Sequence, residues 1–207
     1  IGVNATNGNE LWSFTPECGI WNIMALFPDD ETTVFMDDCG GLYRLNLYSG
    51  AELWRHKGSS GSWTDGGPTL GPDNSIYTCS NGPNSAGLLT LKNSRAGRLR
   101  KYAIEDGSMI WETVLTNPCL NFPSVSPDGQ TVVLADGTNV LDAPMKWVHG
   151  KSPAEIEEAW AFQQELLRTK EQLHYYGHEN LDASILGFDT LTGSAKWKHD
   201  VEPWYGM

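Results

Sequence analysis

The sequence of 207 residues lacks several features that would assign it to a common class. Basic residues are scarce, with 14 Lys and Arg against 26 Asp and Glu and a formal net charge of −12. Without a basic stripe, a nucleic-acid partner is not expected. Uninterrupted apolar runs are only a few residues long, so no transmembrane segment is expected in this chain.

Motifs for metal binding and catalysis are also missing. The four cysteines include no adjacent pair and no C-x-x-C pair, which disfavours a zinc site. The five histidines are scattered, and the Gly-Ser-Ser-Gly stretch at 58–61 lacks the spacing of a hydrolase elbow. Gly66 and Gly67 precede no helix, so they predict no phosphate-binding loop. These residues assign no catalytic group, metal ligand or cofactor ligand.

What the sequence does contain is an internal repeat, in which a glycine is followed four residues later by a tryptophan. The four pairs are Gly8 and Trp12, Gly50 and Trp54, Gly107 and Trp111, and Gly193 and Trp197. The surrounding residues are alike as well, as in Ser-Gly-Ala-Glu-Leu-Trp at 49–54. Each phrase predicts a tight turn that leads into an outer strand.

A second phrase, with Pro-Asp at its centre, precedes three of the four pairs, at 27–30, 71–74 and 126–129. Proline fixes φ and aspartate bonds its own backbone, so these segments predict turns. Between this proline and the repeat glycine lie steps of 22, 35 and 66 residues, which indicates a constant unit with one loop of variable length. The strands expected in the three complete units are 22–27, 32–37, 41–47 and 51–56; 67–71, 75–79, 98–103 and 108–114; and 123–126, 131–135, 184–189 and 194–200.

Several of these strands are apolar on both faces, such as Val132 to Ala135, which is typical of a sheet covered on both sides. Four-stranded sheets stacked face to face around an axis form a β-propeller. We therefore predict an all-β propeller segment of about three and a half blades. The expected units are a half blade at 1–15 and blades at 22–57, 67–115 and 123–200.

The strand Leu42-Tyr43-Arg44-Leu45-Asn46, followed by the glycine and tryptophan phrase, resembles the repeat of the PQQ-like propellers. That family includes quinoprotein alcohol dehydrogenases and the non-catalytic assembly lipoprotein BamB. The resemblance covers most of the chain and implies that Trp12, Trp54, Trp111 and Trp197 are structural and lie between neighbouring blades.

For a dehydrogenase, the resemblance would further imply PQQ stacked on a tryptophan under an adjacent cysteine pair, with calcium beside it. This chain has no such pair, and no cluster of Glu, Asn and Asp stands out as a calcium site. The linker aromatics are expected to serve packing instead. They are Trp21, Trp63, Phe122 and Trp204.

On the blade scheme, all four cysteines fall on one face of the propeller: Cys18, Cys39, Cys79 and Cys119. Four unpaired, buried thiols are the favoured state, and a disulfide between Cys18 and Cys39 is the alternative. Such a bond would suit an extracytoplasmic or organelle-lumenal location.

Two loops on that same face are enlarged, at 80–97 and 136–183. The larger loop contains one amphipathic helix within 151–177, where Ser152 and Glu155 form a capping box and Pro153 occupies the first turn. Its apolar stripe packs on its own propeller or docks a partner subunit. The candidate partner-binding residues are Trp160, Phe162, Leu166, Leu173 and Tyr176.

We expect a non-enzymatic propeller scaffold that mediates protein–protein interaction within a larger assembly. The alternatives are a fragment of a PQQ-dependent dehydrogenase and a lumenal domain that senses peptides. The family closes its ring with about eight blades. The chain is therefore expected to be a piece of a longer polypeptide or an arc completed by another chain, because an open arc exposes sheet edges.

Overall fold

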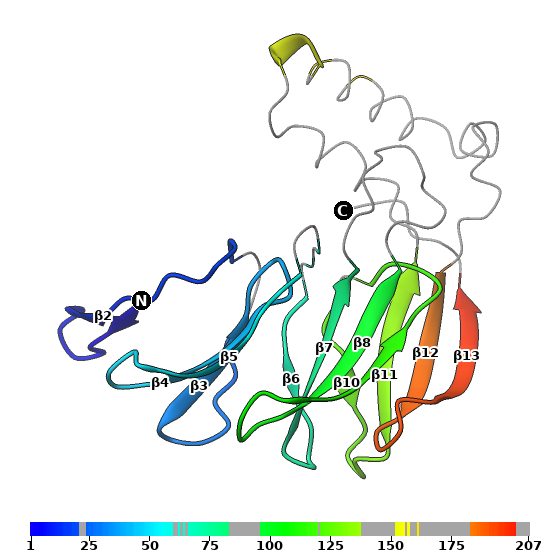
Figure 1. The fold of residues 1–207 in the computed structure, drawn as a ribbon, viewed down its shortest axis with the longest axis horizontal. Helices are drawn as coiled ribbons and strands as arrows, with labels where there is room; N and C mark the ends of the chain where they lie inside the picture. The colour runs from blue at the N-terminus through cyan, green and yellow to red at the C-terminus, as the bar shows by residue number, and fades with distance from the viewer. Residues whose placement is uncertain are drawn as a thin grey trace.

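The strands of the molecule form four antiparallel sheets that lie side by side along an arc (Figure 1). The computed structural model describes residues 1–20, 24–59, 62, 64, 66–82, 96–119, 121–137, 152–155, 157, 161 and 183–201. Within these residues the all-β propeller architecture expected from the repeat is confirmed.

The sheets are called blades 1 to 4 in chain order. Blade 1 contains β1 (Gly2–Val3) and β2 (Glu10–Trp12), and blade 2 contains β3 (Thr32–Met36), β4 (Leu42–Asn46) and β5 (Glu52–His56). Blade 3 contains β6 (Thr69–Leu70), β7 (Ser75–Asn81), β8 (Gly97–Ala103) and β9 (Met109–Val114). Blade 4 contains β10 (Ser124–Val125), β11 (Thr131–Gly137), β12 (Ala183–Asp189) and β13 (Ala195–Val201).

Blades 3 and 4 have the four-stranded order that the repeat predicts, with each strand beside the next in sequence. In blade 2, the first strand is reduced to an isolated bridge between Leu26 and Val34. The residues before it, 21–23, lie outside the described residues. Blade 1 is a two-stranded half sheet.

The repeat glycine closes the turn between the last two strands of every blade. Gly8, Gly50, Gly107 and Gly193 have φ between +69° and +72°. Each donates its N–H to the carbonyl four residues earlier, as Gly50 does to Asn46 at 2.9 Å. A left-handed backbone is readily adopted by glycine, which explains the glycine at this point of the repeat.

Each blade has a tryptophan face, which carries the repeat indole, and an opposite face. The core lies between blades, where the tryptophan face of one meets the opposite face of the next. Between blades 3 and 4 the cluster consists of Tyr77, Cys79, Leu99, Leu115, Cys119, Val132, Leu134, Leu186 and Phe188. Between blades 2 and 3 it consists of Val34, Met36, Leu42, Ile76, Tyr102 and Ile104. These strands are apolar on both faces because both faces are covered.

The favoured state of the cysteines, four free thiols, is wrong. Cys18 is joined to Cys39, and Cys79 to Cys119, with Cα atoms 5.9 Å and 6.0 Å apart. The first pair is the alternative raised above, while the second was not foreseen. The 40-residue spacing of Cys79 and Cys119 gave no sign of it, because the linker returns to β7 only in the folded blade.

The start of the inserted helix follows its sequence signals. Pro153 to Glu155 are helical, and the Ser152 hydroxyl donates to the Glu155 carboxylate at 2.8 Å. The candidate partner-binding residues lie outside the described residues: Trp160, Phe162, Leu166, Leu173 and Tyr176. In the described part of the chain, no helix has the length and apolar character needed to cross a membrane.

Candidate interaction surface

Both enlarged loops leave the propeller from the same end of its sheets. One joins the end of β7 at Asn81 to the start of β8 at Gly97, and the other joins β11 to β12 (Figure 1). The corresponding connection in blade 2 is a short turn at 37–41. We call this end of the blades the loop face.

The loop face is fixed in blade 2 by the carboxylate of Asp37, which is 1% exposed. One oxygen accepts the N–H groups of Cys39 at 3.1 Å and Gly41 at 2.6 Å, which closes the turn. The other accepts the Tyr43 hydroxyl at 2.8 Å and the Cys18 N–H at 3.3 Å. Burial raises the pKa of Tyr43 to about 12, and the neighbouring Asp37 carboxylate adds to that rise.

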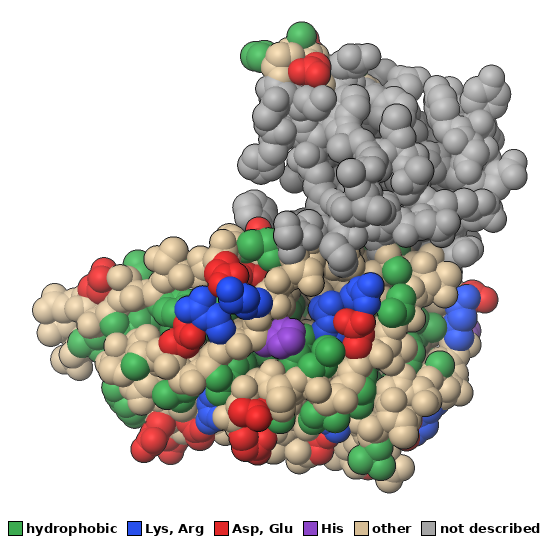
Figure 2. All heavy atoms as spheres, in the orientation of Figure 1, with side chains coloured by type: hydrophobic (Ala, Val, Ile, Leu, Met, Phe, Trp, Pro, Cys, Tyr) green, Lys and Arg blue, Asp and Glu red, His purple; other side chains and the backbone are tan. Residues whose placement is uncertain are grey.

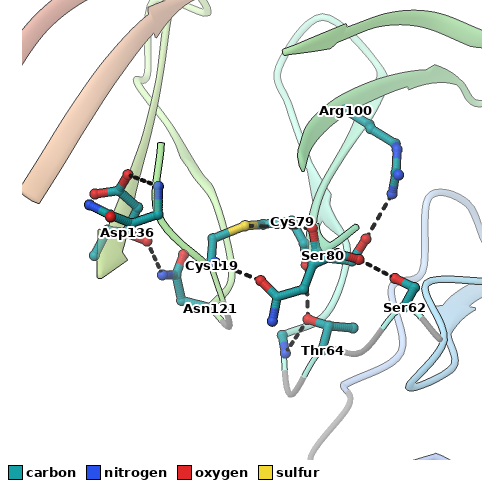
Figure 3. Close-up of a disulfide and its surroundings, with 12 residues drawn as sticks. Ser62, Thr64, Cys79, Ser80, Arg100, Cys119, Asn121 and Asp136 are labelled. Atoms are coloured by element: carbon teal, nitrogen blue, oxygen red, sulfur yellow. Dashed lines mark hydrogen bonds between the residues drawn. A yellow bond between two sulfur atoms is a disulfide. The ribbon is translucent and has the colours of Figure 1, made fainter. Parts of the chain in front are cut away.

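Equivalent positions in the other blades hold the linkers between blades (Figure 3). Nine residues after its Pro-Asp proline, blade 3 has Asn81, whose side-chain oxygen accepts the Cys119 N–H at 3.0 Å. In blade 4 the same position is Asp136, whose carboxylate accepts the Asn117 N–H at 3.3 Å. Each of these side chains therefore anchors a linker to the end of a second strand.

Further polar contacts make this end of blade 3 rigid. Thr64 donates to the Cys79 carbonyl at 2.9 Å, and Ser62 donates to the Asn81 carbonyl. Arg100 donates to the Ser80 hydroxyl at 2.7 Å (Figure 3). It also donates to the Glu112 carboxylate at 2.8 Å. These polar groups are hydrogen-bonded within the protein. The network stiffens the loop face that carries the enlarged loops.

On one face of the described part, charges of both signs are interleaved and not separated (Figure 2). Figure 2 shows Lys and Arg side chains beside Asp and Glu on the face in view. Arg55, for example, pairs with Glu52 at 2.6 Å and with Glu17 at 3.1 Å. Pairing of this kind leaves no basic stripe here to recognise a polyanion.

The described part of the chain offers no free set of three His, Cys, Asp or Glu ligands for the calcium of a PQQ site. The one group there that could offer three metal ligands is Cys18, Asp38 and Cys39, and both sulfurs belong to a disulfide. Thiolates, not disulfides, are the metal ligands. The oxygens of Asp37 are likewise occupied by four donors. We therefore derive no chemistry through that cofactor.

The repeat tryptophans bind neighbouring blades to one another through their indole N–H groups. Trp12 donates to the Leu47 carbonyl at 2.9 Å, and Trp54 donates to the Ile104 carbonyl at 3.0 Å. Trp111 does the same to Thr190 at 3.0 Å. In every case the acceptor is the residue three before the next repeat glycine, so the first three indoles occupy equivalent places in successive blades.

Two basic residues that the sequence analysis missed support these contacts. Arg44 and Lys101 lie opposite the tryptophans of blades 2 and 3 and donate to the same carbonyls, Ile104 and Thr190, at 2.8 Å and 2.9 Å. Lys101 also pairs with Asp73 at 2.8 Å. Burial raises the pKa of Asp73, but its bonds to Lys101 and Tyr77 outweigh that effect and lower the pKa overall. Arg44 and Lys101 hold the same place in the repeat, two residues before Asn46 and Ala103. That shared place was the signal available in the sequence.

A family model described as "Outer membrane protein assembly factor BamB" matches residues 1–204. The chain belongs to this family. No curated protein matches it in sequence.

Solved structures place this BamB-family chain among PQQ-like propellers. BamB from Moraxella catarrhalis is 14% identical, with a TM-score of 0.52 over 95% of this chain and 41% of that one. Quinohemoprotein alcohol dehydrogenase from Comamonas testosteroni is 16% identical, with a TM-score of 0.62 over 97% of this chain and 32% of that one. A europium-containing methanol dehydrogenase is 14% identical, with a TM-score of 0.60 over 96% and 37%. The chain spans less than half the length of each, and these identities show the fold alone.

Proposed function

We propose that this chain is a non-enzymatic propeller scaffold that mediates protein–protein interaction within a larger assembly. The observation that carries the proposal is the construction of the loop face. Its polar side chains at 37, 81 and 136 hold turns and linkers, and the two enlarged loops leave from the same end. Loops presented by a rigid scaffold are a common form of binding surface.

The family supports this proposal, because its description names an assembly factor. We propose an extracytoplasmic or organelle-lumenal location on the basis of the two disulfides, since such bonds persist in oxidising compartments. The proposed contact is the apolar stripe that the sequence predicts for the inserted helix, with Phe162 and Leu166 at its centre.

The contact is tested by affinity purification of the tagged chain from its own source under native conditions, with partners identified by mass spectrometry. Replacing Phe162 and Leu166 by Glu is expected to remove the specific partners while leaving the thermal transition unchanged. Glu157→Lys, a charge change at an exposed helical position, is the matched control and is expected to keep them. An identical set of partners with both variants would contradict the proposed contact.

The alternative, part of a PQQ-dependent dehydrogenase, is favoured by the fold of the two dehydrogenases described above. It is tested by adding PQQ with calcium or a lanthanide to the purified chain. Saturable binding of the quinone and dye-linked oxidation of an alcohol would overturn the scaffold proposal. The scaffold proposal expects neither signal.

A further inference from the structure

The outer strand of blade 3, β9, is a sheet edge with exposed apolar side chains. In the order of its sheet β9 comes last, so only β8 lies beside it among the described strands. Met109, Ile110 and Val114 of β9 are 47%, 51% and 57% exposed. The outer strand of a propeller blade is an edge however many blades the ring has, because neighbouring blades cover the faces of a sheet and not its outer rim. β9 therefore offers an edge to which a further strand can be added.

Charged side chains oppose such addition at the outer edges of blades 2 and 4. One residue before the repeat tryptophan, β9 has Ile110 where β13 has Lys196. Three residues after that tryptophan, β9 has Val114, whereas the equivalent residues are Lys57 in blade 2 and Asp200 in blade 4. A charge at a sheet edge opposes strand addition, because pairing would remove it from water. β9 lacks this protection at both places.

Alternate residues of β9 turn their backbone groups away from the blade. The N–H of Leu115, the residue after β9, donates to the Gly97 carbonyl of β8 at 2.8 Å. In an antiparallel ladder every second residue faces the same neighbour, so Thr113 also faces β8. The backbone N–H and C=O groups of Glu112 and Val114 therefore point outward, where no strand of the described part lies against them. These groups match the donors and acceptors of an extended backbone.

The charges beside this edge favour an uncharged partner segment. Glu112 accepts hydrogen bonds from Arg98 and from Arg100, the latter at 2.8 Å. A basic side chain laid over Glu112 would meet these two guanidinium groups, and an acidic one would meet the Glu112 carboxylate itself. A segment of uncharged, β-branched residues meets neither repulsion and favours the extended backbone. Its apolar side chains can cover Ile110 and Val114.

A second copy of this chain is a poor occupant of the same edge. The antiparallel pairing of β9 with itself that overlaps most of the strand would place the two Glu112 side chains opposite each other. Each copy would also bring its own Arg98 and Arg100, so the two edges would meet with the same net charge. Like charges directly opposite each other destabilise a strand pair. The occupant is therefore a segment of a different protein.

We propose that β9 binds an extended, uncharged segment of a partner protein by adding it as a further strand of blade 3. The backbone of the segment pairs with the outward N–H and C=O groups of Glu112 and Val114, and its apolar side chains cover Ile110 and Val114. This contact is made by the outer edge of a blade and not by the inserted helix. It therefore goes beyond the scaffold contact proposed above.

The probe is a synthetic peptide of about eight residues, a common strand length, in which valine and threonine alternate. It carries fluorescein on a polyethylene-glycol tail, and its threonine amides are N-methylated so that the peptide has one pairing edge and does not associate with itself. Fluorescence anisotropy is expected to show saturable binding to the chain. The same peptide with every amide N-methylated keeps the side chains but loses the donors, and is expected to bind at least about tenfold more weakly. Absence of saturable binding, or equal binding of both peptides, would overturn the proposal.

Two variants close the edge in different ways. Val114→Pro removes an outward N–H and keeps the bonds to β8, since proline is tolerated on the solvent side of an edge strand. Ile110→Lys combined with Val114→Asp gives β9 the residues that β13 has at these places. Each variant is expected to weaken peptide binding at least about tenfold.

Leu53→Lys, the same change at the equivalent exposed position of β5, is the matched control and is expected to bind the peptide like the parent chain. Thermal transitions check that all variants are folded. Full binding by the folded charge variant of β9, or loss of binding in the control, would contradict the proposal.

Amide hydrogen exchange of the chain locates the bound peptide. The Glu112 and Val114 amides are expected to exchange at least about tenfold more slowly with saturating peptide. The amide of Arg55, which has the place of Glu112 on β5, is expected to exchange at the same rate with and without peptide. Protection at Arg55 in place of Glu112 would overturn the choice of β9.

The test is separate from that of the scaffold function. Replacing Phe162 and Leu166 by Glu is expected to remove the partner subunits and to leave peptide binding intact. The charge variant of β9 is expected to lose the peptide and to keep those subunits. Loss of the peptide in the helix variant would contradict a separate site on β9. A failure of either proposal is therefore visible separately from the other.

Discussion

Blades 3 and 4 are built from the same repeat, yet their tryptophan faces differ in what covers them. Trp111 donates to the Thr190 carbonyl of blade 4, and the strand beneath it, β7, is buried along its whole length. Trp197 stands at the equivalent position of blade 4, in the outer strand β13. Every residue of β13 is exposed, whereas Trp111 and Thr113 of the equivalent strand β9 are half-buried. The repeat therefore specifies the blade and its turn, while burial of the indole depends on the next blade.

The comparison also separates two kinds of junction. Blades 2 and 3 place Arg44 and Lys101 beside the indole, so that two donors converge on one carbonyl. Blades 1 and 4 have Gly2 and Gly187 there, and the indole lies flat on the glycine. Blade 4 thus has the type of junction that blade 1 uses against blade 2. In blade 1 the indole N–H of Trp12 is the donor to the next blade, at the Leu47 carbonyl.

The largest expected effect comes from removing the two disulfides. Replacing Cys79 and Cys119 by Ser is expected to lower the free energy of unfolding by about 4 kcal/mol, and replacing Cys18 and Cys39 by about 3 kcal/mol, because loops of 40 and 21 residues are released. Urea unfolding of the oxidised chain and both variants measures this order. Cys79–Cys119 is buried and Cys18–Cys39 half-buried, so mild reductant should open the latter first. Equal stability of both variants and the parent would contradict the prediction.

The next effect distinguishes the covered indole of blade 2 from the exposed indole of blade 4. Trp54→Ala removes an indole packed against the Gly107 turn and is expected to cost about 3 kcal/mol. Trp197→Ala should cost about 1 kcal/mol, because that ring packs only on its own blade and is 44% exposed. Urea unfolding of the parent chain and both variants makes the measurement. Similar losses from both substitutions would contradict the difference in burial between the two indoles.

Much of this architecture could be predicted from the sequence, because the repeat has a local physical basis. The glycine needs its left-handed backbone, and the aspartates of the Pro-Asp turns accept their own backbone N–H groups, as Asp29 does from Glu31 and Thr32. Alternating and continuous apolar runs then located the strands. These signals lie within a few residues of one another, so one sequence is enough to find them.

The contacts that shape the loop face could not be predicted in the same way. The Cys79–Cys119 bond and the bond from the Cys119 N–H to Asn81 join residues about 40 positions apart. Their partners depend on how a linker folds back over a blade. Counting positions within the repeat does place Asp37, Asn81 and Asp136 together, but it does not show what they bind. Pairs of residues this far apart in the sequence are identified only in the folded structure.

A smaller effect is expected from filling the turn glycines. Gly107→Asn keeps a residue that tolerates the left-handed backbone, but its Cβ would meet the Trp54 ring, and overpacking should cost about 2 kcal/mol. Gly8→Asn adds the same atoms at a turn where an added Cβ meets nothing within 4 Å, so it should cost no more than about 0.5 kcal/mol. Thermal melts of both variants report the difference. A large loss at Gly8 would indicate backbone strain and not steric contact as the cause.

The smallest effect is a dependence on pH at the junction between blades 2 and 3. The His56 ring lies 4.9 Å from the Tyr102 ring, and burial, followed by the charge of Arg100, lowers the pKa of His56. The folded chain therefore resists protonation more than the unfolded chain does. This contribution to stability is present above the ordinary value of 6.5 and is lost as the pH falls through the lowered folded pKa.

Between about pH 7.5 and 5.5 the melting temperature should fall by about one or two degrees more in the parent chain than in His56→Gln. The carboxylates of Asp73 and Glu112, whose pKa values are lowered, lose their contribution only at more acidic pH. His199 occupies the equivalent position on the exposed strand of blade 4, so His199→Gln is the matched control. If His199→Gln reduced the pH dependence of the melting temperature as much as His56→Gln does, burial of His56 between blades 2 and 3 would not be its cause.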